Sequence, residues 1–225
     1  MSTSGKNDIS GSGQVRRDQI RPVRAAGWKA QFAHPSGLGG RMAGWLMGRK
    51  NAYIHDLLVE MIAPGPGDRI LEIGFGGGTL VRKLSRAAPG ARVAGIDASG
   101  TMVAQASRLN RRAIEAGRVE LRAAGVSAIP FPDGSFDKVC EANTIHHWPD
   151  PRRDLLEVRR VMRDGGLLAL ALRMKASTPG RLQAPGHDED GISRIARLVE
   201  EAGFRKVELE RRRLAREVVC LLARR

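Results

Sequence analysis

A run of glycines divides residues 69–84 into two segments with different hydrophobic patterns. The first segment, residues 70–73, is short, apolar at three of its four positions and preceded by turn residues, which is the pattern of a buried parallel strand. After the glycines at 74–78, apolar residues recur with helical spacing at 80–84. A strand that passes through a glycine turn into a helix places backbone N–H groups beside a ligand at the carboxyl edge of a sheet.

The glycine turn does not match the two common phosphate-binding patterns. In G-x-G-x-x-G, counted from Gly74, the third glycine position is occupied by Thr79, and no Lys-Ser or Lys-Thr pair completes a P-loop. The strand instead carries an acid, Glu72, two residues before Gly74. A carboxylate there is unfavourable beside a pyrophosphate and favourable beside a cation.

A second acid ends the next apolar run. Residues 92–97 form an expected strand, and Asp97 lies about 20 residues past the glycine turn, the spacing of a carboxylate that accepts hydrogen bonds from ribose hydroxyls. The two acids together favour a positively charged nucleoside without phosphate. S-adenosylmethionine has these features, because it combines adenine, free ribose hydroxyls, an α-amino group and a sulfonium.

Four motifs in order resemble the class I S-adenosylmethionine-dependent methyltransferase family, in particular the ubiquinone/menaquinone-type small-molecule methyltransferase group. They lie at residues 72–78, 97–102, 131–137 and 163–168, and the resemblance covers about residues 50–173, more weakly the remainder. It implies an α/β fold, a Rossmann-like doubly wound seven-stranded mostly parallel sheet with helices on both faces and an antiparallel last strand. It also implies S-adenosylmethionine as cofactor and S-adenosylhomocysteine as product.

The resemblance assigns cofactor-binding roles residue by residue. Glu72 and the backbone of the glycine turn would hold the methionine end, Asp97 the ribose, and the Val126 N–H the adenine. The acid that the family carries after strand three is replaced by Gly125, which leaves Ser127 or water to accept from the adenine amino group. The full set comprises Glu72, Gly74, Phe75, Gly76, Asp97, Ala98, Met102, Val126 and Asn143. For Met102, packing on the adenine and packing in the core are equal alternatives.

Two adjacent histidines are the candidate catalytic residues. His146 and His147 follow expected strand four, at the sheet edge where a methyl acceptor must lie. Histidine is the side chain best suited to accept a proton near neutral pH, although a structural histidine at a helix start is also common. Because adjacent residues are expected to point apart, we expect at most one of the two in the pocket.

The chain of 225 residues is long enough for one good core. We expect a disordered or loosely docked tail at 1–26, an N-terminal helical cap or lid at 27–63 and the S-adenosylmethionine-binding domain at 64–225. Whether residues 27–50 and the long polar connector at 174–190 are mobile lids stays open. The histidines and cysteines lack metal-ligand spacing, so no metal site is predicted.

The formal net charge of +14 is spread along the chain, and aromatic residues make up only 4%, a composition that disfavours a nucleic-acid surface. No stretch is long and apolar enough to span a bilayer, and residues 1–13 lack the apolar middle of a signal peptide. We therefore expect a cytoplasmic enzyme with a small-molecule acceptor. An RNA or other macromolecule methyltransferase and a catalytically silent binding module are the alternatives. The acceptor atom (oxygen, nitrogen or carbon) and the oligomeric state stay open.

Overall fold

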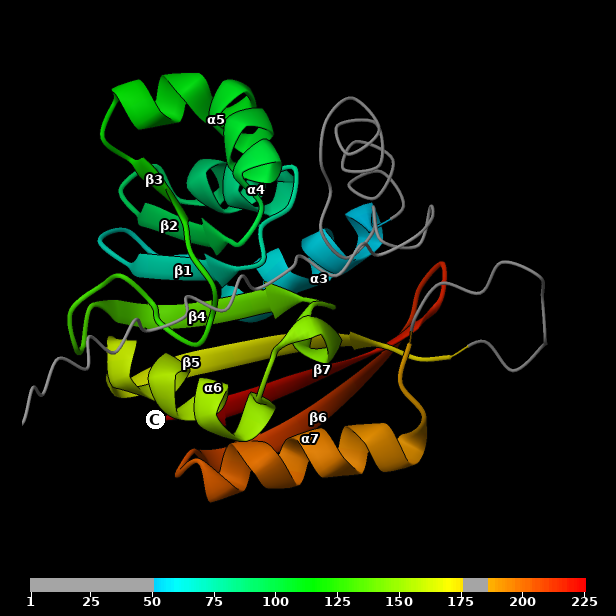
Figure 1. Cartoon of the computed structure of the whole chain (residues 1–225). Coiled ribbons are helices and arrows are strands. Elements are labelled where there is room, and N and C mark those ends of the chain that lie inside the picture. Colours follow the sequence, from blue (N-terminus) through cyan, green and yellow to red (C-terminus); the bar gives the residue numbers. More distant parts are fainter. Residues whose placement is uncertain (1–50, 176–185) are drawn as a thin grey trace, which may run out of the picture.

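The computed structural model describes residues 51–175 and 186–225 of the chain. Within them, seven strands form one sheet in the order β3-β2-β1-β4-β5-β7-β6 (Figure 1). The strands are β1 (Arg69–Ile73), β2 (Arg92–Asp97), β3 (Val119–Ala123), β4 (Phe136–Ala142), β5 (Met162–Arg173), β6 (Arg205–Arg213) and β7 (Glu217–Arg224).

The sheet is parallel from β3 to β5, and β7 runs antiparallel between β5 and β6. The order reverses at β1, since β2 lies on one side of it and β4 on the other. In open sheets of this kind the crevice at such a reversal, at the carboxyl ends of the strands, is where ligands bind. The predicted fold class is confirmed, including the antiparallel last strand.

Helices cover both faces of the sheet, and each face has its own apolar core (Figure 1). Alternation along β1 sends Ile70 to one core and Leu71 to the other. One face carries α3 (Ala52–Ile62), α4 (Thr79–Ala87) and α5 (Gly100–Glu115), and the other carries α6 (Pro151–Val161) and α7 (Glu189–Glu201).

The ends of three of these helices follow from side-chain caps. Ser99, Asp150 and Asp188 accept hydrogen bonds from backbone N–H groups in the first turns of α5, α6 and α7. Of the predicted N-terminal regions, the tail and residues 27–50 of the cap lie outside the described residues, and α3 is the part of the cap that is described. Across 51–175 and 186–225, no helix is both long and apolar enough to cross a membrane.

Gly78 allows α4 and α5 to approach closely. It precedes α4 with φ of 77°, and a Cβ atom there would lie 2.6 Å from the Ala106 Cβ and 2.8 Å from the Asn110 Nδ2. The Asn110 side-chain amide donates to the Gly78 carbonyl at 3.1 Å. Glycine at this position therefore allows the left-handed backbone conformation and also leaves room for α5 to pack against the start of α4.

We expect Gly78→Ala to lower the free energy of unfolding by roughly 2–4 kcal/mol, because left-handed strain and overpacking add. Chemical denaturation measures this. Gly117→Ala is the matched control, since Gly117 has φ of 67° and a Cβ there would meet nothing within 4 Å, and it should cost only about 1 kcal/mol. Equal losses in the two variants would show that close packing at Gly78 contributes nothing.

Candidate functional site

The candidate site begins where the carboxyl ends of β1 and β2 meet. The Gly76 N–H donates to the Asp97 Oδ2 at 2.8 Å, and the Ser99 N–H donates to the Asp97 Oδ1 at 2.9 Å. The Gly74 N–H donates to the Ile96 carbonyl at 2.8 Å. Asp97 thus joins the glycine turn after β1 to the start of α5, and the two predicted ligand-binding segments lie side by side.

The glycine turn adopts a conformation that side chains disfavour. Gly74 and Gly76 have φ of 70° and 50°, and nothing lies within 4 Å of the position that a Cβ on Gly76 would take. Backbone at Gly76 can therefore approach a ligand closely. Phe75 turns the other way: its side chain is 4% exposed and packs on Gly95, where a Cβ would lie 2.6 Å from the ring. Only the backbone of Phe75 is placed to meet a ligand.

Glu72 carries a buried carboxyl group whose Oε2 has no hydrogen-bond partner among the described residues. The residue is 2% exposed and lies on the sheet between Gly95 of β2 and Cys140 of β4. Burial and the negative charge of Asp97 raise the pKa of Glu72 well above its ordinary value, although the Val81 N–H at the start of α4 donates to it. A ligand that brings positive charge or an N–H donor to this place would relieve the cost.

The other side chains predicted to bind the cofactor lie in different environments. Ala98 is exposed, and nothing lies within 4 Å of a Cβ built on Gly125, so the slot of the missing family acid is open space. Met102 is 1% exposed and belongs to the core between α3, α4 and α5. Val126 is 6% exposed, in the core of the opposite face.

Ser127 is engaged elsewhere. Its hydroxyl donates to the Asp154 Oδ1 of α6 at 2.6 Å. That bond uses the single hydroxyl proton and still leaves lone pairs on the oxygen, but it fixes the side chain against α6. Of the two positions, open space is found at Gly125.

The loop after β4 forms the acceptor side. Asn143 has φ of 57°, and its Oδ1 accepts from the Arg173 N–H at 3.1 Å, which ties the end of β4 to the end of β5. The loop then forms a 3₁₀ turn, η1 (Ile145–His147). Both candidate histidines lie on this turn and are exposed, whereas Trp148 is 8% exposed in the core.

The expectation that His146 and His147 point apart is wrong. Their ring centroids are 3.9 Å apart, with a tilt of 46° between the rings. In a 3₁₀ turn, which has three residues per turn, adjacent side chains diverge by about 120°, less than the alternation of an extended chain, so long side chains can meet. Both rings therefore belong to one cluster.

A third histidine joins this cluster from the far side of the connector after β5. The His187 N–H donates to the Arg173 carbonyl and the Lys175 N–H to the His187 carbonyl, both at 2.8 Å, which brings the ring of His187 within 5.9 Å of that of His146. Partial desolvation, with the nearby charges of His147, His187 and Arg173, lowers the pKa of His146 to about 4. His146 is thus a neutral imidazole at pH 7.

Sequence reasoning also missed Glu141, the penultimate residue of β4. It is 0% exposed, and its carboxylate accepts hydrogen bonds from the loop that carries the histidines. A charged residue inside an apolar strand was the available signal, as it was for Glu72. His187 gave no such signal, because only pairing across the connector brings it near His146.

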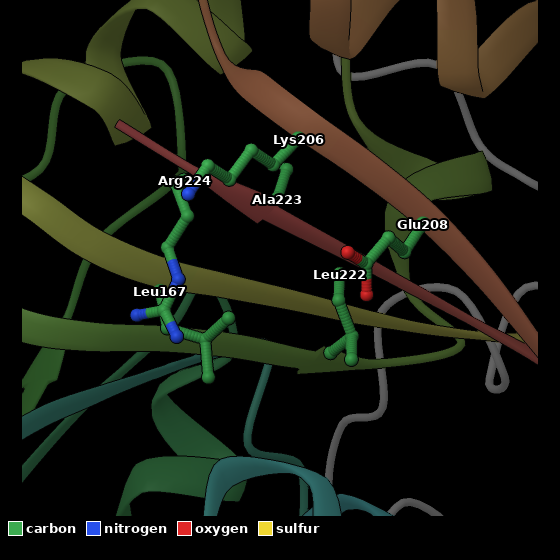
Figure 2. Close-up of a pocket in the computed structure, with 6 residues that line it drawn as sticks. All are labelled: Leu167, Lys206, Glu208, Leu222, Ala223 and Arg224. Atoms are coloured by element: carbon green, nitrogen blue, oxygen red, sulfur yellow. The ribbon is translucent and has the colours of Figure 1, made fainter.

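Another hollow lies at the opposite end of β5 and does not belong to this site. It is lined by residues of β5, β6 and β7, and Figure 2 shows them: Leu167, Lys206, Glu208, Leu222, Ala223 and Arg224. Within residues 51–175 and 186–225, no group of three or more His, Cys, Asp or Glu side chains is arranged to hold a metal ion.

The candidate site thus places two carboxyl groups, Glu72 and Asp97, beside a glycine turn at the reversal point of a doubly wound α/β sheet. Residues 71–170 match the family model described as a methyltransferase domain. The chain is 40% identical over 104 residues to a demethylmenaquinone methyltransferase of Thermus thermophilus, covering 45% of this chain and 46% of that protein. It is 34% identical over 129 residues to 27-O-demethylrifamycin SV methyltransferase of Amycolatopsis mediterranei, covering 57% of this chain and 47% of that protein.

A solved structure shares the fold. A SAM-dependent methyltransferase from Aquifex aeolicus superposes with a TM-score of 0.66 at 21% identity, covering 78% of this chain and 92% of that one. The chain spans about half the length of the two curated relatives above. The matched model and the proteins named above are methyltransferases, in agreement with the family that the motifs of this chain resemble. The individual site residues stay predictions.

The raised pKa of the buried Glu72 carboxyl predicts a pH-dependent difference in stability between the wild-type protein and Glu72→Gln. The pKa of Glu72 is higher in the folded protein than in the unfolded chain. The contribution of Glu72 to the free energy of unfolding is therefore fully present below about pH 4.5 and is lost as pH rises through the folded pKa. Glutamine does not titrate. The melting temperature of the variant minus that of the wild-type protein, both unliganded, should therefore increase between pH 5 and pH 9.

Thermal denaturation followed by circular dichroism at several pH values measures this difference. Glu115→Gln is the control, because the Glu115 side chain at the end of α5 is 65% exposed and its difference should stay flat. A difference for Glu72→Gln that does not change with pH would contradict the raised pKa.

Proposed function

We propose that this chain transfers a methyl group from S-adenosylmethionine to an oxygen, nitrogen or carbon of a small molecule. The sulfonium of the bound cofactor supplies an electrophilic methyl group, so the protein's main task is to align donor and acceptor. The match of residues 71–170 to a methyltransferase domain supports the cofactor. The two curated relatives, whose names specify a demethylmenaquinone and a demethylrifamycin, support a small organic acceptor.

The observation that carries the proposal is the pair of carboxyl groups, Glu72 and Asp97, beside the glycine turn. Asp97 already fixes the turn through the Gly76 N–H and retains acceptor capacity for ribose hydroxyls. The buried, unpartnered Oε2 of Glu72 fits a positively charged amino group at the methionine end. A pyrophosphate would instead meet two negative charges, which disfavours a dinucleotide.

On the acceptor side, His146 or His147 would take a proton from an acceptor that must be deprotonated. The lowered pKa keeps His146 neutral and therefore able to accept at pH 7. It also makes His146 a weaker base than an ordinary histidine, which favours an acidic hydroxyl or an acceptor that needs no base. We also propose that the enzyme works in the cytoplasm with a small-molecule partner.

The direct test is incubation of the purified chain with S-adenosylmethionine labelled in the methyl group and a cell extract, followed by separation by size. Label in the small-molecule fraction supports the proposal. Label in RNA or protein would replace it with a macromolecule methyltransferase. Binding of S-adenosylhomocysteine without any labelled product would indicate a silent binding module.

Asp97 gives a quantitative prediction. We expect Asp97→Ala to weaken S-adenosylhomocysteine binding at least tenfold, ~1.4 kcal/mol, because ribose hydrogen bonds and the bond that orders Gly76 are lost together. Isothermal titration calorimetry measures this. Asp164→Ala, at a side chain that is 95% exposed near the start of β5, should bind as the wild-type protein does. An unchanged affinity in Asp97→Ala would place the ribose elsewhere.

A further inference from the structure

Glu141 is an acid at a position where the sheet offers only apolar neighbours. In the register of the parallel strands it lies between Ile73 of β1 and Leu170 of β5, and both of these are buried. Glu141 itself is 0% exposed. A buried carboxyl group without compensating donors is costly, so its partners indicate what it is for.

The hydrogen-bond donors to this carboxylate come from the loop after β4. The Oε2 of Glu141 accepts from the Thr144 N–H, from the Thr144 hydroxyl at 2.9 Å and from the Ile145 N–H at 3.2 Å. Thr144 precedes η1 and makes no side-chain cap of its own. Glu141 therefore satisfies the free N–H groups at the start of the 3₁₀ turn that carries the histidines.

Thr144 also touches the turn that we assign to the cofactor. A Cβ on Gly74 would lie 2.9 Å from the Thr144 Cγ2 and 3.1 Å from its Oγ1. The same hydroxyl lies 3.4 Å from the Ile73 carbonyl. One side of Thr144 is thus held by Glu141 and the other packs against the first glycine of the turn.

We propose that Glu141 and Thr144 are positioning residues that form a wedge between the glycine turn and the η1 histidines. The wedge would set the distance between the methyl donor and the groups that receive the acceptor. The inference rests on the proposed function, in which these two segments hold the two reactants. In-line transfer depends on this spacing, because a misplacement of about 1 Å can cost on the order of 100-fold in rate.

The wedge responds to pH because its anchor is a buried acid. Burial, opposed by the three hydrogen bonds from Thr144 and Ile145, raises the pKa of Glu141 to about 7. The Oε1 has no partner among the described residues and is the atom that would take the proton. A protonated carboxyl is a weaker hydrogen-bond acceptor than a carboxylate. The hydrogen bonds from Thr144 to Glu141 therefore weaken as pH falls through about 7.

Other titratable or charged groups lie around the wedge, and they have to be separated from it by experiment. They are Glu72 on β1, Cys140 on β4, Cys220 on β7, Arg173 on β5 and the histidines of η1. The two cysteines are buried thiols with raised pKa values and stay neutral near pH 7. Substitution of Glu141 itself isolates its contribution from that of the others.

The experiment compares the wild-type chain with Glu141→Gln, Thr144→Val and Thr144→Ser by titration with S-adenosylhomocysteine between pH 6 and 8.5. Wild-type affinity should rise several-fold through about pH 7. Glu141→Gln should be about fivefold weaker at pH 8, without that rise. Thr144→Val should be weaker to a similar degree, and Thr144→Ser, which keeps the hydroxyl, should restore most of the affinity.

A second readout does not require the cofactor. The NMR titration of the His146 ring, assigned with His146→Asn, should move from about 4 toward the ordinary value of 6.5 in Glu141→Gln, because the packing that lowers its pKa loosens. Glu115→Gln should leave both readouts at wild-type values. If the wild-type protein fails to bind S-adenosylhomocysteine, the proposed function fails, while the His146 titration still tests the wedge.

Two results would overturn the wedge. The first would be an affinity of Glu141→Gln for S-adenosylhomocysteine within twofold of the wild-type value, with the same pH dependence and the same His146 titration. The other is equal affinity of Thr144→Val and Thr144→Ser, which decides the matter even if Glu141→Gln does not fold.

Discussion

The site is organised around a carboxyl group that the protein buries without satisfying. Glu72 lies inside the sheet, 2% exposed, with Asp97 close enough to raise its pKa and one oxygen without a partner among the described residues. Such an arrangement lowers stability in the unliganded protein. It persists because parallel pairing of β1 with β2 and β4 and burial by α4 leave the side chain no route to solvent. In the proposed function, the positively charged cofactor would offset this cost, so that binding and stability would be coupled at Glu72.

The two halves of the site depend on each other through backbone contacts. The glycine turn is bonded to the end of β2, the loop after β4 is bonded to the end of β5, and Thr144 packs between them against Gly74. Each half lies at a strand end that the sheet holds in place. The proposed methyl transfer would require this, because it depends mainly on the alignment of donor and acceptor.

The sequence predicted the elements of the sheet well, since parallel strands are short apolar runs and their turns carry glycine or acid. The strand expected at 92–97 agrees with β2 residue for residue. The site was harder to predict, since a motif specifies the residues of a turn and not the direction in which each side chain points.

Pattern and spacing alone determined the carboxylates at two strand ends and the glycine backbone between them, and the motifs, through the family that they resemble, indicated the α/β class. These are local properties, fixed by periodicity and by the few residues that tolerate each turn. Only the tertiary structure decided that Met102 packs in the core, that the rings of His146 and His147 meet, that His187 joins them and that Glu141 anchors the loop. The burial of Met102 and the approach of His187 depend on packing and pairing between distant segments, whereas the other two outcomes depend on how the chain turns into η1 after β4. Contacts between residues distant in sequence are set by the packing of the whole sheet, and no single segment encodes them.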